Sequence, residues 1–153
     1  MYKQIIIARK DLNLSPGKLS AQVSHGSMAF LTNKIKNNSE LVRKIFFDDE
    51  CEWYETNFAL DKDLYEQWIN GSFTKVTLQA KNKNHLLKAK TMAEEMGMVE
   101  GEDFFLIKDN CLTELEPEEI DDNGVGRTLT CIGFKPMDSE IIDKIGKKYH
   151  LYT

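Results

Sequence analysis

A short apolar run that leads directly into a helix start constrains the fold of this chain most. Residues 3–9, "KQIIIAR", place three adjacent isoleucines between polar residues, which is typical of a buried β-strand. Ser15 and Pro16 then combine a helix-capping residue with one that fits the first helical turn, where its missing N–H needs no partner. This helix can run to about Thr32. A buried strand followed closely by a helix predicts an α/β fold.

The order of strand and helix recurs along the rest of the chain. Strand patterns lie at residues 70–80, 103–109 and 127–136, and helix patterns lie at residues 83–97 and 137–149. We expect Asn84 to cap the first of these two helices and Gly97 to end it. Strands that alternate with helices predict an α/β sandwich around a small sheet that is partly parallel.

Length and composition favour one domain. The chain has 153 residues, of which 41% are hydrophobic and 29% are charged, which suffices for one domain with a core. We expect residues 1–153 to form a single domain, with residues 33–60 as an insertion or excursion that is helical around Glu40–Phe47. No segment approaches the roughly 20 apolar residues of a membrane span, and the N-terminus lacks the layout of a signal peptide. A cytoplasmic protein that does not contact a membrane is therefore expected.

The cysteines and histidines predict neither a metal site nor a disulfide framework. The three cysteines, Cys51, Cys111 and Cys131, are widely spaced and odd in number. The three histidines are scattered as well, so their spacing matches no zinc motif. We expect reduced, structural cysteines, no metal and no cofactor.

The distribution of charge leaves two interpretations open. The net charge of −5 argues against a nucleic-acid partner. However, residues 48–66 hold eight acidic side chains and one lysine, and residues 114–122 hold six acidic side chains and no basic one. The other positions carry 11 acidic and 19 basic residues. These residues can form a basic face, or they can be ordinary surface charge.

Three polar residues share one side of the first predicted helix. At about 100° per residue, Lys18, Gln22 and His25 fall within about 60° of one another, apart from an apolar stripe. Lys18 stands in the first turn, where free N–H groups and the positive end of the helix dipole favour an anion or a developing oxyanion. A lysine there opposes the dipole, which indicates a role other than helix stability. The row is either a solvated helix face or one wall of a site.

Other hydrolase and nucleotide-binding motifs do not fit. Ser24 is adjacent to His25 and cannot face it on a helix, and no G-x-S-x-G elbow occurs. The glycines of "NGVGR" lack the lysine and the strand-then-helix context of a phosphate-binding loop. A serine hydrolase and an NTPase are therefore not expected.

Two longer motifs agree with those of a known family. "IIARKDLNLSPGKLSAQVSHGSM" matches a strand followed by "aRxDLxxxxGKxAAQxxHa", and "IKDNCLTELEPEEIDDNGVGRTLTCIGFKP" matches an acidic turn, a threonine, a glycine-containing loop and a final strand. In these motifs the chain resembles the second (archaeal and eukaryotic type) family of peptidyl-tRNA hydrolases. The resemblance covers nearly the whole chain outside residues 33–60.

The resemblance implies a fold, an activity and a set of site residues. The implied fold is a four-stranded mixed β-sheet with helices on both faces. The implied activity is hydrolysis of the ester bond of peptidyl-tRNA, which releases the peptide and free tRNA, and the implied assembly is a homodimer. The residues implied as catalytic are Lys18, Asp109, Thr113 and Thr128, and those implied as substrate-binding are Gln22 and His25.

Each implied residue has an expected role. We expect Lys18 to contact the oxyanion or a phosphate and Asp109 to anchor Lys18 or to orient water. Thr113 and Thr128 would supply hydrogen bonds to the ribose or the carbonyl. His25 would hold Gln22 or a backbone carbonyl.

Departures from the family's pattern keep a second function open. Asn110 and Cys111 replace the Ala-Gly of the family's acidic turn, and cysteine takes a positive φ less readily than glycine, so a reshaped turn is expected. Gly133 is followed by Phe134 rather than by proline. The acidic stretch before Trp68 could line, cover or obstruct the approach of tRNA. The alternative is a diverged, non-catalytic member that binds tRNA ends or a protein partner.

Overall fold

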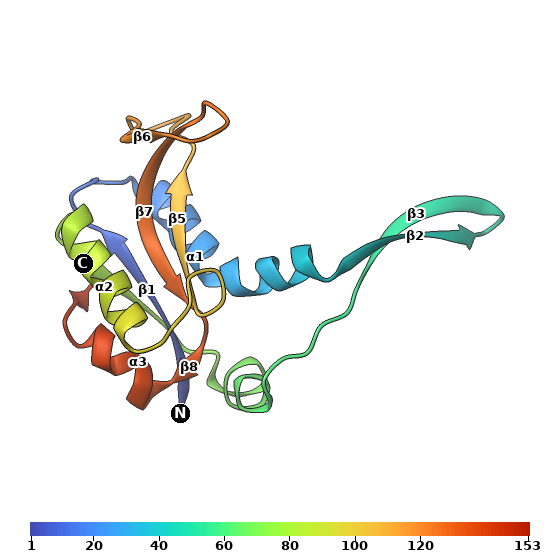
Figure 1. Cartoon of the computed structure of the whole chain (residues 1–153), viewed down its shortest axis with the longest axis horizontal. Helices are drawn as coiled ribbons and strands as arrows, with labels where there is room; N and C mark the ends of the chain where they lie inside the picture. The colour runs from blue at the N-terminus through green and yellow to red at the C-terminus, as the bar shows by residue number, and fades with distance from the viewer.

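A mixed β-sheet forms the centre of the molecule. The computed structural model describes residues 1–153, and its main sheet has the strand order β5-β7-β1-β4-β9 (Figure 1). The long strands are β1 (Tyr2–Arg9), β4 (Lys75–Ala80), β5 (Phe104–Asp109) and β7 (Gly126–Phe134). β1 and β4 are parallel, whereas β7 is antiparallel to both β1 and β5. The expectation of an α/β fold around a partly parallel sheet is therefore confirmed.

The number of strands differs from the expected four. The main sheet has seven strands, because three strands of two residues each join the four long ones. These are β6 (Glu119–Ile120), β8 (Met137–Asp138) and β9 (His150–Leu151). The four-stranded prediction is wrong on this point, since segments of two residues carry no periodic pattern that a sequence could reveal.

Four helical segments surround the sheet. They are α1 (Pro16–Asn37), the wide-turned helix η1 (Leu64–Ser72), α2 (Lys83–Glu95) and α3 (Ser139–Gly146). The hydroxyl of Ser15 accepts a hydrogen bond from the backbone N–H of Lys18, which confirms the predicted cap of α1. Asn82 rather than Asn84 caps α2, so that prediction was two residues late. Gly97 follows the end of α2 with a φ of 84°, as expected of a helix terminator.

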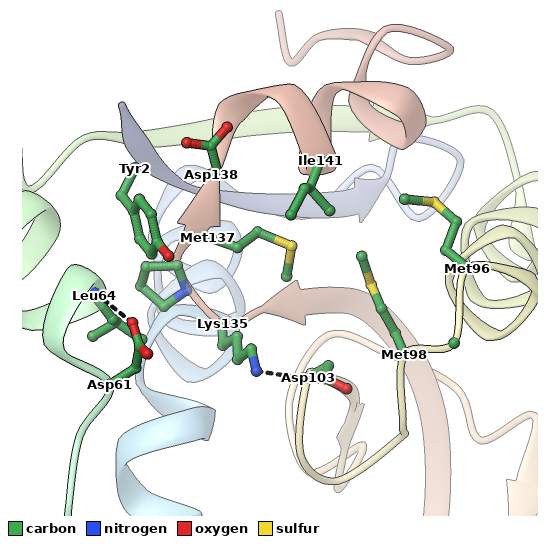
Figure 2. Close-up of a pocket in the computed structure, with 12 residues that line it drawn as sticks. Tyr2, Asp61, Leu64, Met96, Met98, Asp103, Lys135, Met137, Asp138 and Ile141 are labelled. Atoms are coloured by element: carbon green, nitrogen blue, oxygen red, sulfur yellow. Dashed lines mark hydrogen bonds and ion pairs between the residues drawn. The ribbon is translucent and has the colours of Figure 1, made fainter.

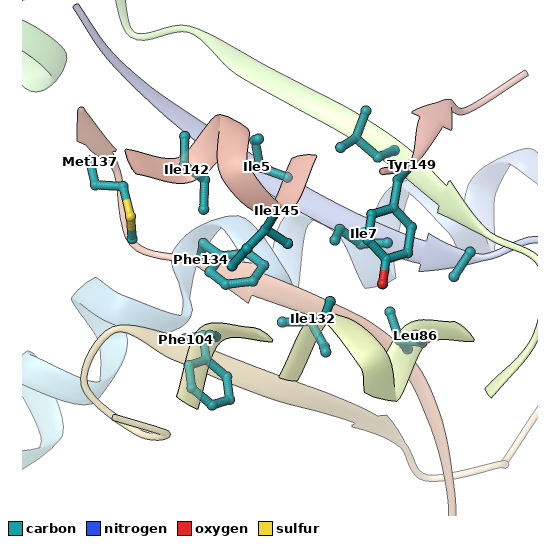
Figure 3. Close-up of a cluster of buried hydrophobic side chains, with 14 of the residues drawn as sticks. Ile5, Ile7, Leu86, Phe104, Ile132, Phe134, Met137, Ile142, Ile145 and Tyr149 are labelled. Atoms are coloured by element: carbon teal, nitrogen blue, oxygen red, sulfur yellow. The ribbon is translucent and has the colours of Figure 1, made fainter. Parts of the chain in front are cut away.

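The two faces of β1 carry separate cores. Ile5 and Ile7 pack with buried residues of α2 and α3, such as Leu86 and Ile142 (Figure 3). Ile6 and Ala8 point to the opposite face, where partly buried residues of α1 cover them. This alternation follows from the two-residue period of a strand, and it explains why all residues between Gln4 and Arg9 are buried. Helices therefore cover both faces of the sheet.

Two glycines set the distance between α1 and the sheet. A Cβ atom on Gly133 of β7 would lie 2.0 Å from the carbonyl oxygen of Gly26 of α1. A Cβ atom on Gly26 would lie 3.1 Å from the side chain of Ile6. The helix backbone thus rests directly on the backbone of β7, which fixes where the start of α1 lies relative to the sheet.

Residues 33–60 form the end of α1 and a protruding hairpin rather than a second helix. The hairpin consists of β2 (Ser39–Phe46) and β3 (Asp49–Thr56), and it projects from the far end of α1 (Figure 1). The prediction of a helix around Glu40–Phe47 is wrong. Phe47 and Asp48 have φ values of 48° and 67° and join paired strands, which is the pattern of a tight two-residue hairpin turn. That residues 33–60 are an insertion into a single domain stays a prediction.

The contact between Gly26 and Gly133 is testable by adding one methyl group. We expect Gly133→Ala to lower the free energy of unfolding by about 2–3 kcal/mol, because the new Cβ can be accommodated only if α1 moves. The matched control is Gly17→Ala, where a Cβ meets no atom within 4 Å. Urea unfolding of both variants checks this, and equal stabilities would contradict it.

Candidate active site

The start of α1 and the end of β5 meet at an ion pair. Nζ of Lys18, in the first turn of α1, lies 2.7 Å from Oδ1 of Asp109, the last residue of β5. The two side chains are 16% and 10% exposed, so the pair is partly shielded from water but open to a ligand. Ser15 and Pro16 place Lys18 here, and the backbone N–H and hydroxyl of Ser15 both donate to Glu114. The helix start is therefore tied to the loop that follows β5.

Both oxygens of Asp109 accept hydrogen bonds. Oδ1 accepts from Lys18 and, at 3.1 Å, from Nε2 of Gln22, while Oδ2 accepts from the backbone N–H of Cys111 at 3.0 Å. Oε1 of Gln22 in turn accepts from the hydroxyl of Thr130 at 2.6 Å. Gln22 is 2% exposed, and both ends of its amide are engaged, so it holds Asp109 in place from within the fold.

The pKa of Asp109 is lowered despite its burial. Burial alone would raise the pKa of this carboxyl, but the hydrogen bonds from Lys18, Cys111 and Gln22 and the charge of Lys18 outweigh burial. Asp109 therefore stays ionised across the physiological range. A carboxylate with a low pKa is a weak base, so its chemistry suits anchoring a cation better than removing a proton.

The turn after Asp109 keeps a left-handed residue without a glycine. Cys111 has a φ of 59°, a conformation that costs a residue with a side chain about 1–2 kcal/mol. The hydrogen bond from its N–H to Asp109 and a contact of its Sγ with Oγ1 of Thr128 at 3.3 Å hold it there. These local hydrogen bonds stabilise the strained residue, and a reshaping relative to the family's Ala-Gly turn stays a prediction.

The two predicted threonines occupy different environments. Oγ1 of Thr113 is exposed and accepts a hydrogen bond from Nζ of Lys18 at 3.2 Å. Thr128 is fully buried, and its hydroxyl donates to the carbonyl of Glu116 at 2.7 Å and accepts from the N–H of Glu118 at 3.2 Å. The structure thus joins Thr113 to the ion pair, whereas Thr128 holds the loop that carries Thr113. The expected contact of Thr128 with substrate does not fit this burial.

His25 lies apart from the other predicted residues. Its side chain is exposed and makes no hydrogen bond, so the expected support of Gln22 or of a backbone carbonyl is not observed. The reason is that Gln22 is buried with its amide bonded to Asp109 and Thr130, whereas His25, three residues further along α1, faces solvent. Of the polar row predicted from helical spacing, Lys18 and Gln22 therefore contact Asp109, whereas His25 faces solvent.

Sequence reasoning missed an ion-pair network at the end of β1. Arg9 is 5% exposed at the end of β1 and binds Asp11 at 2.8 Å and Glu118 at 2.7 Å. Glu118 also pairs with Lys83 at the start of α2, at 3.4 Å. The only local indication of this role was the charge of Arg9 at the end of a buried strand.

The two acidic stretches have different positions. In residues 114–122, Glu118, Glu119 and Asp121 pair with cations, and Glu114 accepts hydrogen bonds from Ser15, so these contacts offset the repulsion within the loop. Residues 48–66 lie in and after the hairpin, and α1, at about 33 Å, separates the hairpin from the helix start. The hairpin therefore neither lines nor covers Lys18, and the effect of this acidic stretch on the approach of tRNA stays a prediction (Figure 1).

A separate hollow lies away from the ion pair. Figure 2 shows a pocket of about 410 Å³ whose lining includes Tyr2, Met96, Met98 and Met137, and none of the predicted site residues contributes to it. The structure also has no group of three or more histidine, cysteine, aspartate or glutamate side chains that could hold a metal ion. No helix combines the length and the apolar character that crossing a membrane requires.

Comparison with known proteins identifies the family of this chain. The family model described as peptidyl-tRNA hydrolase PTH2 matches residues 2–152. The chain belongs to this family.

Archaeal proteins named peptidyl-tRNA hydrolase are similar over nearly their whole length. The protein of Methanopyrus kandleri is 35% identical over 146 residues, which cover 95% of this chain and 93% of that protein. The protein of Thermococcus onnurineus is 31% identical over 144 residues, covering 94% and 92% of the two chains. That of Thermoplasma acidophilum is 28% identical over 152 residues, covering 99% of each. The predicted resemblance is therefore confirmed.

The ionised state of Asp109 gives a pH-dependent prediction. We expect Asp109→Asn to lower the free energy of unfolding at pH 7 by about 1–3 kcal/mol, because charge-assisted hydrogen bonds are lost. A lowered pKa contributes stability above the ordinary value of 3.8, and this contribution disappears as the pH falls through the pKa of the folded state. The difference between variant and wild type should therefore shrink below pH 3.8.

Urea unfolding at pH 7 and pH 3 measures this difference. The matched control is Asp122→Asn, an exposed aspartate of the neighbouring loop that forms no ion pair. A difference that stays constant with pH would contradict the role of the Asp109 charge.

Proposed function

We propose that this chain hydrolyses the ester bond between the peptide and the terminal ribose of peptidyl-tRNA, releasing the peptide and free tRNA. The observation that carries the proposal is the pair of Lys18 and Asp109 at a helix start, with Thr113 bonded to the same ammonium. Membership of the family and the names of the archaeal relatives support it.

Lys18 is the residue best suited to stabilise the transition state. An ammonium group has three N–H donors, and two of those of Lys18 bind Asp109 and Thr113. The third is available to the carbonyl oxygen of the ester, which gains negative charge when water attacks. Free N–H groups at the start of α1 add a positive potential at the same place. Because Asp109 holds Lys18 before substrate binds, little reorganisation is needed during the reaction.

Thr113 is placed to contact water or ribose. Its oxygen accepts from Lys18, so its own O–H hydrogen remains free to bind a water molecule or a ribose hydroxyl. Asp109 then acts through Lys18 and Thr113 as the anchor of the group. Water is the only co-substrate of the proposed reaction. Since the substrate belongs to translation, we place the activity in the cytoplasm.

The remaining predicted residues take supporting roles in this proposal. Gln22 positions Asp109, and Thr128 positions the loop that carries Thr113. His25 faces solvent, where it can contact only a part of the tRNA outside the ester site.

The non-catalytic alternative relies on the departure at Asn110 and Cys111, on the net acidity and on residues 33–60. The hairpin within residues 33–60 lies beyond the far end of α1 from Lys18, and the family and the names of the relatives favour hydrolysis. Hydrolysis is therefore the better supported function.

Turnover of diacetyl-lysyl-tRNA tests the proposed roles. We expect Lys18→Ala to lower kcat by about 100-fold or more, because a donor aimed at the developing oxyanion is removed. Asp109→Ala should lower kcat by a similar factor, since Lys18 loses its anchor. The matched control is Lys36→Ala, which removes an exposed lysine at the other end of the same helix and should leave kcat unchanged. Full activity of Lys18→Ala would refute the assignment.

We further propose that the chain forms a homodimer through its hairpin. Ile45 and Phe47 are 79% and 92% exposed there, and an isolated two-stranded hairpin is only marginally stable in water. The charges of the hairpin are already paired within one copy, because Arg43 of β2 contacts Glu50 and Glu52 of β3 and Lys44 contacts Glu55. The exposed apolar side chains therefore carry this proposal, and a two-fold axis can pack the same side chains of two copies against each other.

The same isoleucine-to-serine substitution, made once in the hairpin and once elsewhere on the surface, tests whether the hairpin is the dimer contact. Ile45→Ser should weaken dimerisation about tenfold, since burial of an isoleucine contributes about 1.5–3 kcal/mol. Ile120→Ser, at a position of β6 that is 75% exposed, should leave dimerisation unchanged. Analytical ultracentrifugation of both variants and the wild type measures the dissociation constant. A monomeric wild type, or equal effects of the two variants, would overturn the proposal.

A further inference from the structure

A hollow beside α2 is lined by cations and contains no acidic residue. It has a volume of about 340 Å³, and its lining residues are His85, Lys88, Thr91, Met92, Lys148 and Tyr149. The hollow lies where α2 meets the C-terminal segment that leads into β9. None of its residues belongs to the proposed ester site. We call it the lysine pocket.

The cations in and around the lysine pocket lack acidic partners. Lys81, Lys88, Lys147 and Lys148 are exposed, and none of them forms a salt bridge. Neighbouring lysines of the same helix differ, because Lys83 pairs with Glu118 and Lys90 pairs with Glu94 and Glu100. Glutamates thus pair with these neighbouring lysines but not with the lysines of the pocket.

His85 adds a fixed neutral donor to this surface. Its Nδ1 accepts a hydrogen bond from the backbone N–H of Lys81 at 3.0 Å, which leaves the ring hydrogen on Nε2. Its ring stacks on Tyr149 with centroids 4.5 Å apart. Burial and the positive charges of Lys81, Lys88 and His150 lower the pKa of His85, so these groups act on the same small volume.

The lysine pocket lies near the same end of the sheet as the ester site. Glu118 joins the two regions, because it binds both Arg9 and Lys83, and its N–H binds Thr128. Lys88 lies five residues beyond Lys83 on α2, a rise of about 7.5 Å. A ligand whose end reaches Lys18 can therefore also extend over α2 if it is a long chain.

We propose that the lysine pocket binds backbone phosphates of the tRNA whose ester is held at Lys18. Lys88 and Lys148 line the pocket from two different segments of the chain, and Lys81 and Lys147 add positive charge beside it. Several cations without acidic partners on one surface suit a chain of phosphates better than a single small anion. This inference rests on the proposed function for the identity of its ligand. It gives the enzyme a second anchor that recognises tRNA independently of the peptide.

Binding of deacylated tRNA tests the inference without any need for turnover. We expect the double variant Lys88→Ala/Lys148→Ala to bind fluorescently labelled tRNA about tenfold more weakly at low salt. The slope of log Kd against log salt concentration should fall by about 1–2, since each lost phosphate contact removes about 0.7–0.9. The matched control is Lys34→Ala/Lys36→Ala, which removes two lysines without salt bridges at the far end of α1.

Kinetics then separate this inference from the proposed function. With peptidyl-tRNA, Lys88→Ala/Lys148→Ala should raise KM and leave kcat unchanged, because neither residue reaches the ester. If the wild type binds tRNA through these lysines but does not hydrolyse peptidyl-tRNA, the inference stands and the proposed function fails. If the wild type hydrolyses its substrate while both double variants bind tRNA as tightly as it does, or equally weakly, the inference is overturned and the proposed function stands.

Discussion

The carboxylate of Asp109 is the interaction on which the site depends. It accepts hydrogen bonds from α1 through Lys18 and Gln22 and from the following loop through the N–H of Cys111. Two chain segments far apart in sequence, the start of α1 and the end of β5 with its following loop, are thereby held to one charged group. Because these bonds also keep the carboxylate ionised, the same contacts that assemble the site maintain the charge that orients Lys18.

This arrangement requires that α1 lie very close to the sheet. Side chains of ordinary length at Gly26 and Gly133 would push the helix outward, and Nζ of Lys18 would then no longer reach Asp109 at 2.7 Å. The ion pair of the site therefore depends on the close packing of these two glycines. Thr128 and Thr130 complete the site from β7, since one fixes the loop and the other fixes Gln22.

The sequence predicted local features well and distant ones only through family resemblance. Ser15 as a cap and Lys18 in the first turn follow from neighbouring residues alone. The meeting of Lys18 with Asp109, 91 positions away, has no local cause and came from the matched motifs. Thr130 was missed because its hydrogen bond depends on strand register, and β2 was mistaken for a helix because short amphipathic segments fit both periods. Strands of two residues leave no pattern at all.

The continuity of α1 has a mechanical consequence. One unbroken helix carries Lys18 in its first turn and the hairpin after its last, and Gly26, pressed against β7, lies between them. Along the helix axis, Gly26 lies about 12 Å from Lys18 and about 16 Å from Asn37. The hairpin and the ammonium group therefore belong to one continuous element, which the sheet holds at a point between them.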